Sequence, residues 1–417
     1  MGSIDAQKTT TDWQAGEAAR HVKGAALASA LNDARDRTLG LFAAYEATLG
    51  PGLRCPRSHE VNLPLWELGH IGWFTDWWIA RNPERALGIQ ANPFVARLPA
   101  RRANADALYD SSNVAHATRW TLDLPDAAAV RAELQISLGE TLTLLSAAPQ
   151  DDTTLYLFRL SLFHEDMHTE AATYMAQTLG FDPFSHGAGA HPVPSVGQNQ
   201  ELQLPATEWR LGRSGGGFSF DNECVGETVA LAATGIDSAP VTWARYLPFV
   251  ESGAADQRSF WSNAGWSWRK AQANGLPRYL RHSAAGWEAK RFGVWQALDL
   301  EESAVHLTLH EAEAWCRWAG RRLPSEAEWE AAAHLLPGFQ WGSAWEWTAS
   351  EFRPFAGFEP HPYRDYSAPW FDGRPVLKGA SPATVPRMRH PRYRNFFTAD
   401  RNDIMAGFRS AALPAHR

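Results

Sequence analysis

Two histidines four residues apart are the strongest chemical signal in the sequence. His164 and His168 lie in the run His-Glu-Asp-Met-His-Thr-Glu over residues 164–170. Residues four apart share one face of a helix, so both imidazoles can bind the same metal ion. Apolar residues surround the pair, namely Leu160, Phe163, Met167 and Met175. They place this helical face near a core, which favours a metal site over a solvated pair.

The first five residues of this run also spell H-E-x-x-H, the motif of zinc proteases, in which Glu165 would be the general base. One large group of these proteases continues with a glycine three residues later and a third histidine three residues after that. This sequence has Ala171 and Tyr174 at those positions. No downstream helix clearly offers a glutamate ligand instead. The sequence therefore disfavours a protease.

An upstream histidine, His70, is the better candidate for a third ligand. Gly69 and Gly72 beside it permit a close approach of backbone or ligand. Three neutral imidazoles leave open positions that suit iron(II), O2 and a substrate heteroatom, although zinc or nickel fits the same ligands. Glu170, two residues after His168, has two interpretations: it orients an imidazole N–H, or it is a solvated helix charge.

Helices must position these histidines, and apolar periodicity predicts four of them in the first half of the chain. The second begins with Asn62 as its N-cap and Pro64 in its first turn, and it stops before Asn82-Pro83. Such helices with mostly short connections predict a bundle, and the long connection over residues 83–122 indicates function or an extra element. The four ranges are about 25–49, 62–81, 125–147 and 152–179.

The sequence changes character after residue 180. Residues 181–200 are rich in Pro, Gly, His and Ser, which predicts a linker. Short β-rich pieces, glycine clusters and scattered tryptophans then predict a loop-rich α+β domain over residues 201–417. Two short helices in it begin with capping boxes, Thr308 with Glu311 and Ser325 with Glu328. We therefore expect a flexible segment (1–22), a metal-binding helical bundle (23–180), the linker and the α+β domain.

Composition excludes several function classes. The 417 residues carry a net charge of −7 with no long cationic run, which argues against nucleic acid as a partner. No apolar stretch approaches the roughly 20 residues that cross a bilayer, and no apolar signal core is found at the N-terminus. Three widely spaced cysteines favour a reducing cytoplasm over a disulfide framework. The 20 tryptophans are mostly expected in cores, but a few could line a pocket for a cation.

The motifs together resemble a known family. His70 and the His164-x-x-x-His168-x-Glu170 motif are similar to the DinB-type four-helix bundle of ergothioneine-type sulfoxide synthases. Residues 315–330, 345–350 and 407–409 resemble the formylglycine-generating-enzyme-like domain, which has a C-type-lectin-like fold. The combined resemblance spans residues 25–412, and the order of the two parts is specific to this family.

The resemblance implies a cofactor, substrates and site residues. Enzymes of this family hold Fe(II) with three histidines, use O2 as cosubstrate, and join a chalcogen donor to imidazole C2 of hercynine, the trimethylated betaine of histidine. By the match of residues 361–366, Tyr363 would supply a proton or hydrogen atom and Tyr366 would line the betaine pocket. Asn395 falls on a position that contacts the betaine, and Phe396 would form an apolar or cation–π wall there.

Departures from the family pattern bear on the donor. Phe397 stands where γ-glutamylcysteine users carry an Asp, and Met167 stands where many members have a Gln. The run over residues 109–120 lacks the pair of donor-binding arginines and offers Asp110, hydroxyls and amides suited to a sugar. This pattern is more similar to the selenoneine synthases, which use a selenosugar; cysteine or another thiol is the alternative. Asp110 and Arg119 are candidates to contact the donor or the betaine carboxylate.

Two other function classes stay open at this point. A DinB-type zinc-dependent thiol transferase would need no O2 and would have no use for Tyr363. A non-catalytic binding protein would use its lectin-like domain for recognition and would not depend on His70.

Overall fold

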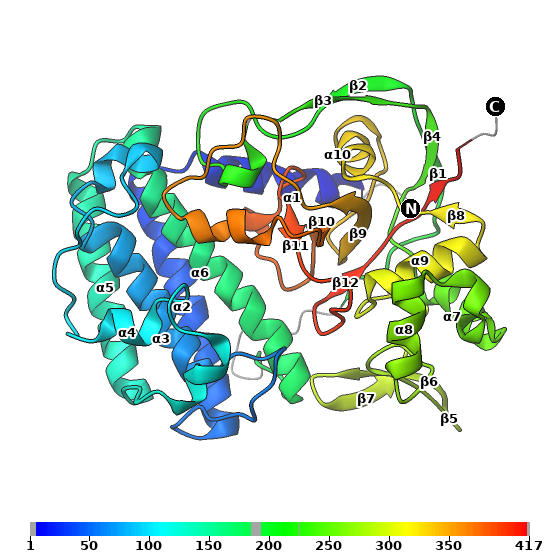
Figure 1. The fold of residues 1–417 in the computed structure, drawn as a ribbon, viewed down its shortest axis with the longest axis horizontal. Helices are drawn as coiled ribbons and strands as arrows, with labels where there is room; N and C mark the ends of the chain where they lie inside the picture. The colour runs from blue at the N-terminus through cyan, green and yellow to red at the C-terminus, as the bar shows by residue number, and fades with distance from the viewer. Residues whose placement is uncertain (1–5, 185–192, 225, 415–417) are drawn as a thin grey trace.

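The chain folds into a helical half and a half built from short strands and helices, with helix α6 at their junction (Figure 1). This computed structural model describes residues 6–184, 193–224 and 226–414. Buried residues of both halves, such as Trp66 and Leu160 from the first and Trp345 and Phe408 from the second, form one continuous apolar core. Among the described residues, no helix is long and apolar enough to cross a membrane.

The four long helices predicted for the first half are all present, and they pack against one another in pairs. Local capping explains where the last of them begins and ends. The Asp151 side chain accepts a hydrogen bond from the Thr154 N–H, and Gly180 adopts the left-handed conformation (φ 83°) that terminates a helix. The four are α2 (Gly24–Leu49), α3 (Pro64–Thr75), α5 (Ala127–Ala147) and α6 (Asp152–Leu179).

Helix α3 differs from its prediction at its start. Its N-cap is Leu63, with Pro64 at the first helical position. Asn62 does not cap the helix, because its amide donates to the Glu67 carboxylate instead. At the other end the backbone continues as one wide π turn, η1 (Asp76–Ala80), so the apolar face reaches Trp78 before the chain turns away at Arg81.

The long connection between α3 and α5 contains short elements, as its length indicated. Helix α4 packs on α3, and the end of α4 lies beside His70. These elements are η2 (Arg85–Gln90), α4 (Ala105–Tyr109) and η3 (His116–Thr121).

The N-terminal segment is more ordered than expected. Residues Ala6–Arg20 form helix α1, which packs on η9 (Pro386–Met388) of the second half. The buried Arg20 guanidinium binds both carboxylate oxygens of Glu223 at 2.6 and 2.8 Å. These contacts hold the segment in place, although its polar composition led us to expect a flexible segment. Residues 1–5 lie outside the described part of the chain, as do residues 185–192 of the expected linker.

In the described residues of the second half, the strands form four small sheets. Their strand orders are β1-β4-β13-β8, β11-β10-β9-β12, β2-β3 and β5-β6-β7, and all described pairings are antiparallel except β12 with β9. The strands are β1 (Glu201–Leu204), β2 (Thr207–Arg210), β3 (Thr228–Leu231), β4 (Thr234–Asp237), β5 (Leu280–Ser283), β6 (Gly286–Arg291), β7 (Val294–Ala297), β8 (Arg321–Arg322), β9 (Ala344–Glu351), β10 (Pro375–Ala380), β11 (Asn395–Phe396), β12 (Ala406–Gly407) and β13 (Ala411–Ala412).

Four α-helices of the described part of this half lie among these sheets. Both predicted capping boxes are present: Thr308 with Glu311 opens α9, and Ser325 with Glu328 opens α10. The helices are α7 (Trp243–Glu251), α8 (Asn263–Ala271), α9 (Leu309–Trp318) and α10 (Glu326–Leu335). Loops of this half, including η7 (Arg364–Tyr366), extend toward α6 and complete the site described next.

Candidate metal centre and adjoining pockets

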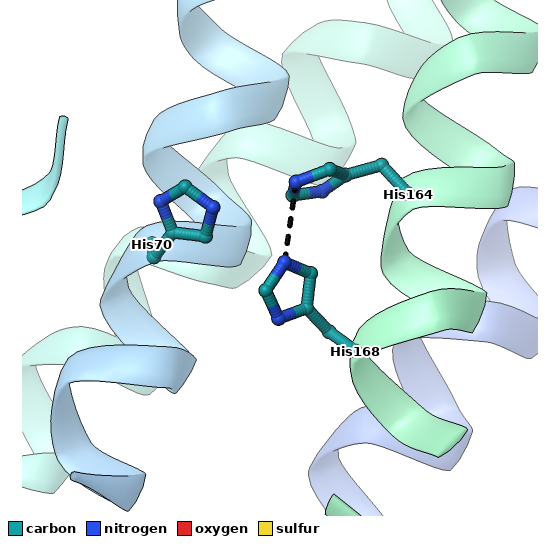
Figure 2. A group of neighbouring side chains, drawn as sticks. All are labelled: His70, His164 and His168. Carbon is teal, nitrogen blue, oxygen red and sulfur yellow. Dashed lines mark hydrogen bonds between the residues drawn. The ribbon is translucent and has the colours of Figure 1, made fainter. Parts of the chain in front are cut away.

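Three histidines meet between α3 and α6. His70 projects from α3 toward His164 and His168, which lie one turn apart on α6 (Figure 2). One ring nitrogen of each lies within 4.8 Å of the others, and the Nε2 atoms of His164 and His168 are 3.2 Å apart. The Phe74 ring stacks on the His164 imidazole and fixes its plane. Three converging nitrogens at this spacing fit a single metal ion better than three independent side chains.

The outer nitrogens of two of these rings are held by hydrogen bonds. His70 Nδ1 lies 2.8 Å from the Tyr109 carbonyl oxygen at the end of α4, and His168 Nδ1 lies 2.5 Å from Glu67 Oε2. With Nδ1 donating in each case, Nε2 carries the lone pair and faces the centre. Burial lowers the pKa of His70 to about 3, and burial also lowers that of His164. Neutral imidazoles of this kind are metal ligands.

Glu67 is a site residue that the sequence prediction missed. Burial acts to raise its pKa, but His168 and His70 outweigh burial and lower it to about 2. Glu67 is therefore a buried carboxylate beside the imidazoles. Its position three residues before His70, on the same helical face, was the available signal.

Glu170, by contrast, does not orient an imidazole, so that interpretation is wrong. Its Oε1 accepts hydrogen bonds from Trp345 Nε1 (2.6 Å), Ser381 Oγ (2.8 Å) and Thr384 Oγ1 (2.9 Å). Burial raises the pKa of this carboxyl. Glu170 thus joins α6 to the second half. It is not a solvated helix charge either.

The two acidic residues between the histidines also point away from the metal centre. Both oxygens of Glu165 bind Arg35 on α2 (2.8 and 3.1 Å), and Thr38 Oγ1 donates to Oε1 (2.8 Å). Both oxygens of Asp166 bind Arg387 of the second half at 2.7 Å. Because Glu165 is held in this way against α2, the geometry gives it no role as a general base in a zinc protease.

A pocket of about 580 Å³ opens in front of the histidines. The second half contributes Tyr363, whose ring centroid lies 6.0 Å from that of His164 and 4.9 Å from that of Phe74. Burial raises the pKa of Tyr363, so its hydroxyl keeps its proton. The structure thus places Tyr363 in the same pocket as His164 and His168. The other residues of this pocket include Arg119, Met167, Tyr366 and Phe396.

A smaller pocket of about 200 Å³ adjoins the first and shares Met167, Tyr366 and Phe396 with it. Tyr366 stacks on Phe220 (4.4 Å between centroids), and its hydroxyl lies 3.1 Å from that of Tyr393. The predicted residues Asn395 and Phe397 line this pocket. Three of its aromatic residues were not foreseen: Tyr174, Trp345 and Tyr393. The buried Glu170 carboxyl also lines this pocket.

The two remaining candidates, Arg119 and Asp110, lie in different pockets. Arg119 lines the metal pocket with its guanidinium 3.5 Å from the Trp66 ring centroid, and its buried Nε has no hydrogen-bond partner in the described part of the chain. Asp110 does not line the metal pocket. It lines a neighbouring pocket on the other side of Tyr363.

Comparison with known proteins agrees with this arrangement. Residues 197–343 match the sulfatase-modifying factor enzyme 1-like domain. Over 92% of its length the chain is 30% identical to the hercynine oxygenase of Mycolicibacterium smegmatis, covering 98% of that protein. It is 28% identical to the hercynine oxygenase of Mycobacterium tuberculosis, again with 92% and 98% of the two chains covered.

A further relative matches a smaller part of the chain. The formylglycine-generating enzyme of Streptomyces coelicolor is 32% identical over 37% of this chain and 56% of its own. Because they cover 92% of this chain, the two mycobacterial relatives extend over the helical half that holds the three histidines. On the strength of that full-length similarity, the chain belongs to the hercynine oxygenase family.

Proposed function

We propose that the protein is an O2-dependent non-heme iron enzyme that joins a selenosugar to imidazole C2 of hercynine. The observation that carries this proposal is that Tyr363 lines one pocket with His164 and His168, between the two halves of the chain, and that His70 lies close enough to share a metal ion with them. A site between two parts of a protein can exclude water during oxidative chemistry.

The histidines fit the proposed metal. His70, His164 and His168 would hold the ion through the nitrogens that face one another, leaving the side of the 580 Å³ pocket open. When bound, iron(II) would supply the one-electron chemistry that O2 requires. The hydrogen bonds to the Tyr109 carbonyl and to Glu67 keep the ring planes fixed while substrates enter and leave.

The aromatic pocket supports a betaine as substrate. Quaternary ammonium groups are bound by the faces of aromatic rings, and this pocket offers several of them around the buried Glu170 carboxyl. Asn395 at its edge can donate its amide N–H to the betaine carboxylate. A hercynine molecule held there would direct its imidazole toward the metal pocket through the shared residues Met167, Tyr366 and Phe396.

Tyr363 is the group placed to deliver a proton. Its phenol keeps its proton at neutral pH because burial raises its pKa. Its ring is held by contacts with Phe74 and with Trp78 at 6.2 Å. In the proposed reaction the C2–H and Se–H hydrogens leave in one water molecule, and the other oxygen atom of O2 remains on selenium. Hydrolysis of the sugar C–Se bond would then release the sugar and leave a selenenic acid, which two equivalents of an external thiol would reduce to selenoneine with formation of a disulfide and water.

The selenosugar is the finer part of the proposal and depends on the donor side of the site. Ser111, Ser112 and Asp365 border the metal pocket, and such groups match sugar hydroxyls. Phe397 occupies the position where an Asp would hold γ-glutamylcysteine in relatives that use it. A thiol carrying a carboxylate, such as cysteine, is the second candidate, and Arg119 is the observation that favours it, because its half-buried guanidinium lines the metal pocket and can pair with a carboxylate.

A competition assay tests the proposal. Iron(II)-loaded protein receives hercynine, O2 and equal amounts of selenosugar, cysteine and γ-glutamylcysteine, and the products are identified by mass spectrometry. A selenium-containing betaine is the expected main product. A sulfoxide would overturn the donor assignment but keep the iron chemistry. Product formation without O2, unaffected by Tyr363→Phe, would instead favour a zinc-dependent thiol transferase.

A further inference from the structure

A second large pocket adjoins the metal pocket. Its volume is about 540 Å³, and it shares Ser111, Ser112, Tyr363 and Asp365 with the metal pocket. The Ser112 hydroxyl donates to Asp365, which joins the helical half to the loop that carries Tyr363. These shared residues form the boundary between the two pockets, so a ligand in the second pocket would lie next to the metal site.

One wall of this pocket is aromatic. Trp77 and Trp78 come from the π turn that ends α3, and Phe94 comes from the following loop. The guanidinium carbons of Arg97 and Arg81 lie 4.7 and 5.2 Å from the Trp77 ring centroid and hold that ring in place. Phe94 is 79% exposed. A large aromatic ring left this open at the edge of a pocket is suited to cover a ligand.

The facing wall is polar. Asp110 accepts hydrogen bonds from the Ser112 N–H (3.0 Å) and from Asn113 Nδ2 (2.7 Å), which fixes its carboxylate. Each carboxylate oxygen has a further lone pair, and the Asn113 side chain keeps a second N–H and its carbonyl oxygen. Arg364 is the one cationic side chain among the described lining residues, and it lies over Phe94, 5.8 Å from the ring centroid.

These two walls define the class of ligand. A zwitterionic amino-acid thiol would need a cation inside the pocket to pair with its carboxylate, and the described lining places its one cation at the rim. A ring with hydroxyls at its edge and C–H groups on its faces satisfies both walls at once. We propose that this pocket binds the neutral sugar ring of the donor, between Trp77, Trp78 and Phe94 on one side and Asp110 and Asn113 on the other.

This inference rests on the proposed function, because it assumes that the sugar ring bound in this pocket is part of the chalcogen donor. The sugar's chalcogen substituent would lie on the side of Tyr363, the residue that lines both pockets. The pocket thereby explains why Asp110 lies away from the metal pocket although its sequence neighbours border it.

Binding is tested first without any turnover. Saturation-transfer NMR with methyl β-D-glucoside, an unreactive sugar, is recorded on the full-length protein and on Phe94→Ala and Asn113→Ala. The matched control is Ile89→Ala, because Ile89 is 50% exposed in the same connection and does not line the pocket. We expect signals from the ring C–H protons with the unchanged protein and the control, and at least about a fivefold loss in the two pocket variants. No signal with the unchanged protein, or equal signals in all four, overturns the inference.

Turnover separates this inference from the proposed function. With iron(II), hercynine and 1-thio-β-D-glucose, Phe94→Ala should raise the KM for the thiosugar by about tenfold and leave the KM for hercynine unchanged. An unchanged KM for the thiosugar overturns the pocket assignment while the proposed function stands. Absence of O2-dependent product from every donor overturns the proposed function, and the NMR result then decides the binding site separately.

Discussion

Two of the three imidazoles at the candidate metal centre are oriented by a hydrogen bond to the outer ring nitrogen. His70 uses a backbone carbonyl, which no side-chain substitution removes, whereas His168 uses the Glu67 carboxylate. The charge of Glu67 raises the basicity of the His168 ring and thereby strengthens its bond to a metal. We therefore expect substitutions of Glu67 to weaken metal binding more than they destabilise the fold.

Glu67→Gln should weaken iron(II) binding by about 10- to 100-fold, because the amide keeps the shape of the side chain and loses its charge. Titration against a chelator under anaerobic conditions measures the affinity. Glu170→Gln is the matched control, since Glu170 binds Trp345, Ser381 and Thr384 and no imidazole. Equal loss of metal in the two variants would contradict the assignment of Glu67.

Gly69→Ala tests the close packing behind His70. A Cβ atom at Gly69 would lie 2.2 Å from the Tyr109 ring, whose residue also supplies the carbonyl that binds His70. Overpacking of this kind costs about 1–3 kcal/mol, and here it should also weaken metal binding. Gly139→Ala in α5 is the control, because nothing lies within 4 Å of a Cβ there. Urea unfolding should show a loss of stability for the first variant and none for the second.

The sequence could predict the three histidines but misassigned the acidic residue that supports them. Spacing of four placed His164 and His168 on one face, and glycines marked His70. Glu170 follows His168 by two residues, which turns it by about 200° around the helix and away from the metal. Glu67 precedes His70 by three residues and therefore shares its face. Helical geometry alone favoured Glu67 over Glu170.

Helix α6 does more than carry two ligands. Successive side chains of its central turn bind α2, through Glu165 and Arg35, and the second half of the chain, through Asp166 and Arg387. The metal-binding face is thereby fixed from both sides. Helices of this kind were predictable, because apolar periodicity and caps determine their length. Their polar contacts with distant residues were not predictable, because those partners lie more than 100 residues away in sequence.

Helix α1 is the element that sequence reasoning missed, because polar contacts rather than an apolar stripe attach it. Arg20→Ala would leave the buried Glu223 carboxylate without its partner and should destabilise the protein by about 3–5 kcal/mol. Arg353→Ala is the matched control: its pair with Glu351 is largely exposed and should matter by less than about 1 kcal/mol. Equal urea midpoints for the two variants would show that the Arg20–Glu223 ion pair does not anchor α1.

Across the whole molecule, buried histidines make stability depend on pH. Burial lowers the pKa of His334 in α10 to about 4. Because an unfolded chain takes up this proton near pH 6.5, the stability present above about pH 6.5 is lost as the pH falls toward 4. Glu311 acts in the opposite direction, since burial raises its pKa to about 7. The contribution of His334 must therefore be isolated by substitution.

Urea unfolding of the unchanged protein and of His334→Gln at about pH 7.5 and about pH 5 isolates that contribution. Over this interval the unchanged protein should lose about 1–2 kcal/mol more than the variant, because the variant takes up no proton at position 334 on unfolding. The same loss in both proteins would contradict a depressed pKa for His334.

The two halves of the chain share one apolar core. Apolar periodicity and the change in composition after residue 180 were enough to predict a helical part followed by a part that contains sheets. The pockets could not be predicted, because Tyr174, Trp345 and Tyr393 come from three distant segments that only the fold brings together.

O2 consumption by the iron(II)-loaded protein is the decisive measurement for the proposed oxidation of hercynine. Rapid O2 uptake should require hercynine together with a chalcogen donor, and His70→Ala should abolish it, because one of the three imidazoles is then missing. O2 uptake that is equally fast without hercynine would contradict substrate-dependent oxidation at this site. Product formation at the same rate without O2 would contradict the iron chemistry altogether.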